Sequence, residues 1–355
     1  MTTKRQVVEH MKTKEIRKNT EVKLFKPAQA FYLECGGVIP QLEIAYTTLG
    51  ELNAEKSNVV WVCHALTANA NPAEWWPGLV GEGFLIDPEK HFVVCANIIG
   101  SCYGTTGPLS LNAQGRRKYY SEFPFVTVRD MVSAHILLAD ELGIDKIKLL
   151  LGGSLGGQQV MEWSIMQPGR IVSQALVATN AFHSPYGIAF NESQRLAIFA
   201  DETYFHNTDS GGAKGLKAAR SIALISYRTY SAYNTTQKEE NIHKTDGYNA
   251  SGYQQYQGDK LVNRFNAYSY VSLSRAMDSH NVGRHRGSIE QALASIKANT
   301  LCIGIRSDVL FPPVEQQFLR DHIPGAHYAE IDSAYGHDGF LIEVKKLTEI
   351  IKELL

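Results

Sequence analysis

The chain has 355 residues, 44% of them hydrophobic and 20% charged, and a net charge of −1 at pH 7. A chain of this length buries a full core and exceeds the size at which single cores usually stop growing, so one large domain with an inserted subdomain is expected. The near-zero net charge provides no strong field toward nucleic acid or anionic lipid, so neither a nucleic acid nor a membrane is expected as a partner.

The cysteines and the N-terminus indicate the compartment. The cysteine count is odd and no Cys-x-x-Cys pair occurs, which argues against a disulfide framework or a thiolate zinc site. The five positions are Cys35, Cys63, Cys95, Cys102 and Cys302. Residues 1–20 are polar and lack the apolar segment of a signal peptide, and no apolar run approaches the roughly 18 residues that span a bilayer. We therefore expect a cytoplasmic protein with no metal site and a flexible N-terminal arm over residues 1–20.

The predicted elements, in chain order, alternate between strands and helices. Two short strands come first, FYLECGG (31–37) and LEIAYTTLG (42–50), each ending at glycine. Apolar runs then predict buried parallel strands, and helical spacing of apolar residues predicts the helices between them. The strands are expected at 58–66, 91–100, 147–153, 171–178, 300–308 and 327–333, and the helices at 127–142, 158–166 and 340–355.

This alternation predicts an α/β protein whose mostly parallel central sheet is covered by helices on both faces. Residues 181–295 interrupt it, because they contain helix-like stretches and a polar run over 235–260 but no convincing buried strand. We therefore predict a core formed by residues 21–180 and 296–355. Residues 181–295 are expected to form a helical cap inserted between the fourth and fifth buried strands.

A Gly-x-Ser-x-Gly motif stands between the strand over 147–153 and the helix that follows. Such a motif between a strand and a helix predicts a nucleophile elbow, in which Ser154 is lifted above the sheet at a helix N-terminus. Gly152 and Gly156 lack Cβ atoms and let the two backbones approach closely. The N–H of Leu155 is then a donor for a developing oxyanion. A glycine-rich turn that only packs tightly is the alternative.

Two further residues complete a catalytic triad with Ser154. A serine hydroxyl needs a base to take its proton, and a third group must orient that base. In α/β-hydrolases these groups follow the serine in the order acid, then histidine. Asp308 follows the strand over 300–308, and His337 follows the strand over 327–333. Taken singly, Asp308 suits a turn and His337 a helix cap, but their order and strand-end positions favour the triad.

His64 competes with His337 for the role of base, since it also ends a buried strand. It precedes the serine in the chain, however, and therefore suits the loop that carries the second oxyanion donor. We expect the backbone N–H of Leu66 to be that donor and the His64 ring to be structural.

The sequence resembles the homoserine O-acetyltransferase family from about Phe31 to the C-terminus. The resemblance is carried by blocks in both the predicted core and the predicted cap. These blocks are CHALTANA (63–70), WWPGLVGEG (75–83), NIIGSCYGTTGP (97–108), GGSLGGQQVMEW (152–163), NESQRLAI (191–198), SRAMDSHNVGRHRG (274–287), SDVLFPP (307–313) and YGHDGF (335–340).

The resemblance implies an α/β-hydrolase fold and a ping-pong acyl transfer in methionine biosynthesis. Ser154 would take an acetyl group from acetyl-CoA, and the hydroxyl of L-homoserine would then accept it. Arg220, Tyr227 and Asp338 match the homoserine-binding residues of the family. No cofactor is implied beyond acetyl-CoA as co-substrate, and a homodimer built through the cap is expected.

Several alternatives stay open at this point. Arg220 also suits a solvated helix face, Asp338 a helix cap and Tyr227 the core. Trp75 and Trp76 suit an acyl tunnel or ordinary packing, and the cluster over 284–286 suits CoA phosphates or a solvated basic loop. Succinyl-CoA as donor, serine as acceptor, a plain carboxylesterase, and a non-catalytic binding protein are the competing functions.

Overall fold

A mostly parallel eight-stranded sheet runs through the computed structural model, which describes residues 21–112 and 114–355. Strands β5 to β10 pair in parallel, whereas β1 and β4 are antiparallel to their neighbours. The sheet order is β1 (Lys23–Phe25), β4 (Ile44–Leu49), β6 (Phe92–Ala96), β5 (Val59–Cys63), β7 (Ile147–Gly153), β8 (Ile171–Val177), β9 (Asn299–Ile305) and β10 (His327–Ile331). A separate pair consists of β2 (Phe31–Tyr32) and β3 (Val38–Ile39). The predicted α/β fold is confirmed, while the predicted arm over 1–20 lies outside the described residues.

Helices cover both faces of this sheet. Successive residues of a buried strand point to opposite faces, so each strand contributes apolar side chains to both layers of helices. Trp61 of β5 packs in one apolar cluster with α3 and α4, whereas Val60 packs in a second cluster with α13. The helices outside residues 181–295 are α2 (Pro72–Trp75), α3 (Val128–Glu141), α4 (Leu155–Met166), α11 (Pro313–His322), α12 (Gly339–Ile342) and α13 (Val344–Ile351), with 3₁₀ turns at Tyr120–Glu122, Gly336–Asp338 and Lys352–Leu354. Within the described residues, every helix is too short or too polar to cross a membrane.

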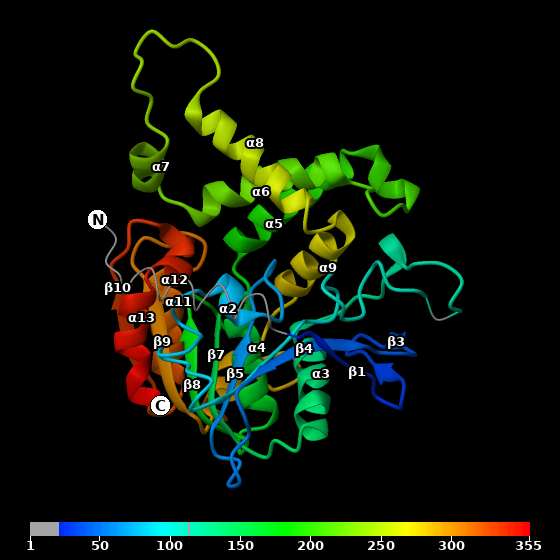
Figure 1. Ribbon diagram of the computed structural model, residues 1–355, viewed down its shortest axis with the longest axis vertical. Coiled ribbons are helices and arrows are strands. Elements are labelled where there is room, and N and C mark those ends of the chain that lie inside the picture. The colour runs from blue at the N-terminus through cyan, green and yellow to red at the C-terminus, as the bar shows by residue number, and fades with distance from the viewer. Residues whose placement is uncertain (1–20, 113) are drawn as a thin grey trace.

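Most helices of residues 181–295 lie above the carboxyl ends of the parallel strands (Figure 1), whereas the last of them contacts α11 of the core. The helices of this group are α5 (Pro185–Phe199), the 3₁₀ turn Glu202–His206, α6 (Ala213–Tyr227), α7 (Tyr230–Thr236), α8 (Asn249–Val262), α9 (Ala267–Asp278) and α10 (Ile289–Ala294). Helix α8 begins inside the polar run over 235–260, where no helix was predicted, and ends two residues beyond it. Its only buried residues are Gly258 and Leu261, so it has no apolar stripe for a periodicity search to find.

A cluster of ion pairs joins the end of this helical group to the core. Arg129 of α3 contacts Glu34 and Glu162, both at 2.7 Å. Arg284 pairs with Glu34 at 2.8 Å, and Arg286 donates to Glu162 at 2.9 Å. Carboxylates of the core already bind the two arginines of the basic cluster over 284–286. These arginines are therefore neither free for CoA phosphates nor part of a solvated basic loop.

Glu162 is the most deeply buried acid of this ion-pair cluster, with 2% of its side chain exposed. Burial alone would raise the pKa of this carboxyl. The hydrogen bond from Arg286 and the charges of Arg286 and Arg129 outweigh burial and hold its pKa below the ordinary value of 4.5.

Glu162→Gln is expected to destabilise the protein by about 3 kcal/mol at neutral pH, because it leaves buried guanidinium groups without their carboxylate. Since the folded-state pKa lies below the unfolded-state value, the carboxylate's contribution is complete above about pH 4.5 and is lost as the pH falls through the folded-state pKa. Urea unfolding of both proteins at several pH values measures the difference.

Glu122→Gln is the matched control, since its pair with Arg117 is about half exposed, at 54% and 56%. We expect it to cost less than about 1 kcal/mol. A gap between wild type and Glu162→Gln that stays constant down to pH 3 would contradict the linkage.

Candidate active site

Ser154 lies in the tight turn between β7 and α4, with a backbone φ of +58°. This left-handed conformation is strained for a residue other than glycine and persists only where the surroundings enforce it. A Cβ on Gly156 would lie 2.2 Å from the carbonyl oxygen of Cys63, and one on Gly152 would lie 2.5 Å from the carbonyl group of Gly156. The two glycines therefore permit the backbone contacts that hold the turn. Ser154 occupies the N-cap of α4, but its side chain makes no capping hydrogen bond.

Asp308 and His337 are joined by a buried hydrogen bond, with 2.6 Å between His337 Nδ1 and Asp308 Oδ2. The other carboxylate oxygen of Asp308 accepts the backbone N–H groups of Leu310 and Phe311 at 2.8 and 2.9 Å. The ring of Phe311 also stacks on the imidazole, with centroids 4.9 Å apart. The carboxylate and the phenyl ring thus fix the imidazole in one orientation.

A second carboxyl group, that of Glu315, lies behind Asp308 at the start of α11. Burial and, to a smaller extent, the charge of Asp308 raise the pKa of Glu315 to about 8, against a hydrogen bond from Asn180 that lowers it. A Glu315 side chain that is mostly neutral at pH 7 adds little negative charge behind the Asp308–His337 pair.

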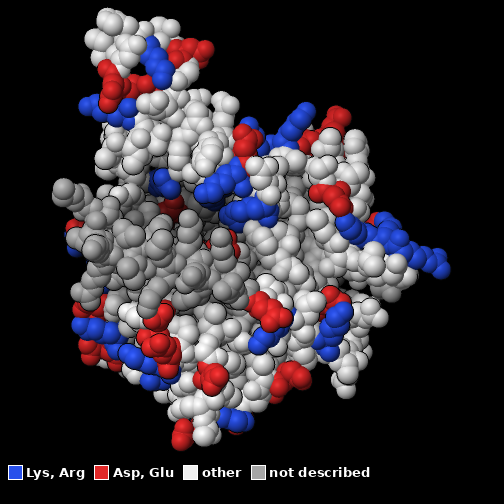
Figure 2. Space-filling view, viewed as in Figure 1, with Lys and Arg blue, Asp and Glu red and all other residues white. Residues whose placement is uncertain are grey.

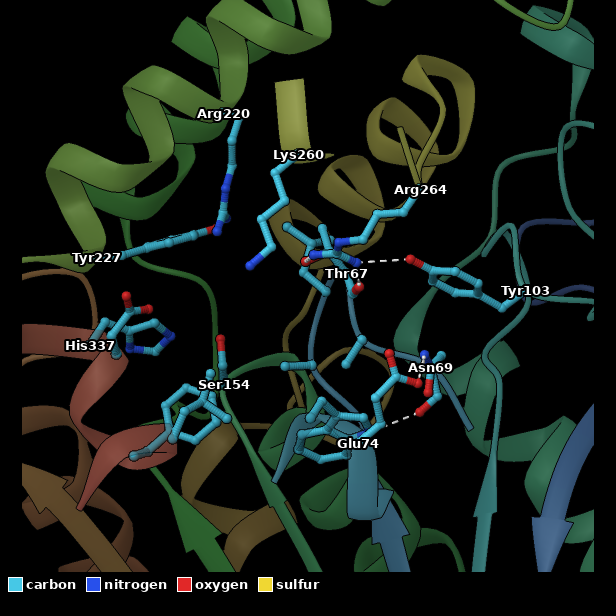
Figure 3. A pocket seen from close by; sticks show the side chains of 17 residues that line it. Thr67, Asn69, Glu74, Tyr103, Ser154, Arg220, Tyr227, Lys260, Arg264 and His337 are labelled. Atoms are coloured by element: carbon cyan, nitrogen blue, oxygen red, sulfur yellow. Dashed lines mark hydrogen bonds between the residues drawn. The ribbon is translucent and has the colours of Figure 1, made fainter. Parts of the chain in front are cut away.

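Ser154 and His337 face the same cavity, whose volume is about 410 Å³ (Figure 3). Among the hydrogen bonds of the described residues, none joins the Ser154 hydroxyl to the imidazole. Such bonds often form only when substrate is bound. The structure thus brings the two side chains to one cavity, and their direct contact remains a prediction.

The two predicted oxyanion donors lie beside Ser154. Leu66 lines the cavity, and Leu155 is the first residue of α4. Within residues 21–112 and 114–355, neither backbone N–H donates to another protein group. Both amides are therefore free to bind an oxygen atom of a ligand.

His64 is fully buried, and both of its ring nitrogens are engaged. Nδ1 lies 2.9 Å from the carbonyl oxygen of Ala65, and Nε2 accepts the N–H of Ile98 at 3.2 Å. Burial lowers the pKa of His64 to about 4, so the ring is neutral at pH 7. This ring is structural and has no nitrogen left to act as a base.

Three predicted substrate-binding residues line the same cavity: Arg220, Tyr227 and Asp338. The Arg220 guanidinium lies 5.5 Å from the centroid of the Tyr227 ring, and it makes no salt bridge in the part of the chain that the structure describes. Arg220 is thus not on a solvated helix face. Asp338 makes no capping hydrogen bond to α12, and its carboxylate pairs with Arg228 at 3.0 Å. Sequence reasoning missed Arg228.

Two further cations of this cavity were also missed, Lys260 of α8 and Arg264 just after it. Arg264 is held by the hydroxyls of Tyr103 and Thr67, at 2.8 and 3.2 Å. Lys260 extends into the cavity between Arg220 and Arg264 (Figure 3) and has no salt-bridge partner among the described residues. Figure 2 shows Lys and Arg side chains gathered at the hollow beneath the helices of residues 181–295.

Of the two tryptophans Trp75 and Trp76, one lines the cavity and the other lies in the core. Trp75 lines the cavity, whereas Trp76 is fully buried, stacks on Trp75 at 5.2 Å and donates its indole N–H to the carbonyl of Phe340. Nowhere in the described chain do three or more His, Cys, Asp or Glu side chains come together in an arrangement that could hold a metal ion.

Comparisons with known proteins agree with this architecture. Residues 58–344 match the family model of the alpha/beta hydrolase fold. A homoserine O-acetyltransferase from Cyclobacterium marinum is 47% identical over 329 residues, which cover 93% of each chain.

Solved structures show the same fold. The homoserine O-acetyltransferase from Bacillus anthracis superposes with a TM-score of 0.87 at 24% identity, over 94% of this chain and 97% of that one. Esterase E22 superposes with a TM-score of 0.85 at 23% identity, over 94% and 99% of the two chains. The fold is thus shared with an esterase, whereas the identity of 47% is to a homoserine O-acetyltransferase. The chain belongs to the homoserine O-acetyltransferase family of the α/β-hydrolase fold.

Proposed function

We propose that this enzyme transfers an acetyl group from acetyl-CoA to the hydroxyl of L-homoserine, as a step of methionine biosynthesis. One observation carries the proposal: Ser154 and the Asp308-bound His337 share a cavity with Arg220, a guanidinium without a carboxylate partner in the described chain. The triad supplies acyl chemistry, and the free guanidinium suits the carboxylate of an amino acid.

In the first half-reaction, His337 takes the proton of the Ser154 hydroxyl while the oxygen attacks the thioester carbonyl carbon. The negative charge on the carbonyl oxygen is stabilised by the N–H groups of Leu66 and Leu155. The carbon–sulfur bond then breaks, the thiol leaves with the proton from His337, and an acetyl ester of Ser154 remains.

In the second half-reaction, Arg220 binds the carboxylate of homoserine and Asp338 binds its ammonium group. Holding both ends aims the hydroxyl at the acetyl-serine and raises its effective concentration above that of water. His337 takes the hydroxyl proton, the new ester forms, and Ser154 leaves with that proton. The ion pair with Arg228 supports this role because it holds the carboxylate of Asp338 in one orientation at the cavity. Tyr227 forms the wall between Arg220 and His337.

The donor in this scheme carries several phosphate groups, and the cavity has an excess of cations. Besides Arg220, which is assigned to the acceptor, Lys260 and Arg264 line it, against Glu74 and Asp338 as acids, and Asp338 is already paired with Arg228. Such a charge balance supports a polyanionic donor such as a CoA thioester. Succinyl-CoA as donor, serine as acceptor and plain ester hydrolysis are the alternatives.

We also propose that residues 181–295 act as a cap that limits water at the acyl-enzyme.

The cap exposes large apolar side chains on neighbouring helices, Leu196 of α5 at 59% and Ile225 of α6 at 60%, which supports a homodimer built through it. A monomeric mass in analytical ultracentrifugation at micromolar concentration would count against this homodimer.

All five cysteines are free thiols, which supports a reducing, cytoplasmic compartment.

A substrate matrix tests the proposed function directly. Acetyl-CoA, succinyl-CoA and p-nitrophenyl acetate are each mixed with the enzyme alone, with L-homoserine and with L-serine, and release of CoA or nitrophenol is followed. We expect fast CoA release only from acetyl-CoA with homoserine. Ester hydrolysis together with CoA release that no amino acid accelerates would instead identify a carboxylesterase.

Ser154→Ala is expected to abolish the acyl-enzyme, because no other oxygen nucleophile occupies the turn. Intact-protein mass spectrometry after mixing with acetyl-CoA should show an acetyl increment on the wild type and none on the variant. An acetylated Ser154→Ala protein would assign the nucleophile to another residue.

Arg220→Ala is expected to raise the KM for homoserine about 10- to 100-fold, the loss of one charge-assisted contact. The rate of Ser154 acetylation in the absence of homoserine should change little. Lys217→Ala is the matched control, since Lys217 lies one turn earlier on α6 and pairs with Asp259 at 2.7 Å. Equal loss of both half-reactions in Arg220→Ala would contradict its assignment to the acceptor.

A further inference from the structure

The peptide unit between Ala65 and Leu66 is held from the side opposite its N–H. Its carbonyl oxygen, on Ala65, lies 2.9 Å from Nδ1 of His64. Because Nε2 of the same neutral ring accepts the N–H of Ile98, the ring proton is on Nδ1 and is donated to Ala65. In a trans peptide the C=O and N–H bonds point in opposite directions, so this contact aims the N–H of Leu66 away from the ring.

The peptide unit between Ser154 and Leu155 is held in the same way. Its carbonyl oxygen, on Ser154, accepts the hydroxyl of Thr179 at 2.9 Å. Thr179 is fully buried and follows β8, so it reaches this peptide from a neighbouring strand. Each of the two proposed oxyanion amides therefore has a buried side chain fixed on the carbonyl of its own peptide.

One side chain links the two segments that carry these amides. Gln159 is fully buried one turn into α4, and its Nε2 donates to the carbonyl oxygens of His64 and Leu155, both at 3.1 Å. Its Oε1 accepts from Nε2 of His135 at 3.1 Å. A flipped amide would set its oxygen against two carbonyl oxygens, so only this orientation satisfies the contacts.

We infer that Gln159 and Thr179 are positioning residues of the oxyanion hole, Gln159 setting the separation of its two amides and Thr179 the direction of one. The inference rests on the proposed acyl chemistry of Ser154. The physical reason is that oxyanion donors act only within hydrogen-bond range of the developing charge, about 2.7 to 3.1 Å, and the two amides lie on different segments of the chain. Without the Gln159 bridge, the segment after β5 and the start of α4 can separate.

Gln159→Met tests the bridge, because methionine has a similar size and no hydrogen-bonding amide. We expect kcat/KM for p-nitrophenyl acetate to fall about 10- to 100-fold. A small alkylboronic acid, which binds serine as a tetrahedral anion, should bind more weakly by the same factor, while the Kd of CoA changes less than about twofold. Equal falls in kcat/KM and in boronate affinity, with an unchanged Kd of CoA, indicate loss of transition-state stabilisation. A general loss of active protein would lower kcat/KM without changing boronate affinity.

Gln174→Met is the matched control. Gln174 is equally buried in β8 and is bonded to Ser164 and Thr300, but it bonds neither the segment after β5 nor the first turn of α4. It should lose stability and keep both kcat/KM and boronate affinity. Thr179→Val removes the second contact without changing the side-chain shape and should weaken both quantities, whereas Thr179→Ser restores the hydroxyl and should recover most of the loss.

Unchanged boronate affinity in both Gln159→Met and Thr179→Val would overturn the inference, as would an equal loss in Gln174→Met. Should Gln159→Met fail to fold, the Thr179 pair alone decides the result. Hydrolysis of p-nitrophenyl acetate needs no homoserine. An enzyme that hydrolyses the ester through Ser154 but transfers nothing to homoserine would therefore contradict the proposed function and leave this comparison valid.

Discussion

The contact between the start of α4 and the end of β5 is the constraint on which the rest of the site depends. Gly156 packs against the carbonyl of Cys63 so closely that any Cβ would overlap it. This contact holds Ser154 in a left-handed conformation that costs on the order of 1–3 kcal/mol. It also makes the segment after β5, which carries Leu66, a neighbour of the helix that begins at Leu155. One backbone contact thus gathers the proposed nucleophile and both proposed oxyanion amides.

Two groups of basic side chains differ in their partners. Arg129, Arg284 and Arg286 are held by the carboxylates of Glu34 and Glu162, and they join the end of the helical group to the core. Arg220 and Lys260 face the cavity without a carboxylate partner in the described chain. A cation that lines a cavity without a carboxylate partner is available for a charge-assisted hydrogen bond to an anionic ligand. This difference, more than the triad, supports transfer to a charged acceptor.

In the proposed mechanism, transfer to homoserine and transfer to water would use the same three side chains, those of Ser154, Asp308 and His337. The fold is shared with an esterase. What distinguishes the two transfers is the competition between water and a bound alcohol for the acyl-enzyme. In the proposed mechanism, Arg220 and Asp338 decide that competition by fixing both ends of homoserine, and the cap lowers the supply of water. The proposed specificity therefore depends on both the helical group, through Arg220, and the core, through Asp338, whereas the proposed acyl chemistry depends on the core.

The sequence by itself determined the α/β fold and the candidates Ser154, Asp308 and His337, because their signals are local: a buried strand, a glycine turn, or a strand end. Parallel strands end at one edge of a sheet, so residues at strand ends meet there irrespective of the conformation of the loops.

Only the tertiary structure decided which charges are paired. The partners of Asp338 and Glu162 are distant in sequence, at Arg228 and Arg286, and no periodicity encodes such contacts. Helix α8, which carries Lys260, has no apolar stripe, because it rests on its neighbours through only a glycine and a leucine. The Gln159 bridge was equally invisible, since a buried glutamine gains its meaning only from the two carbonyls that the folded chain brings to it.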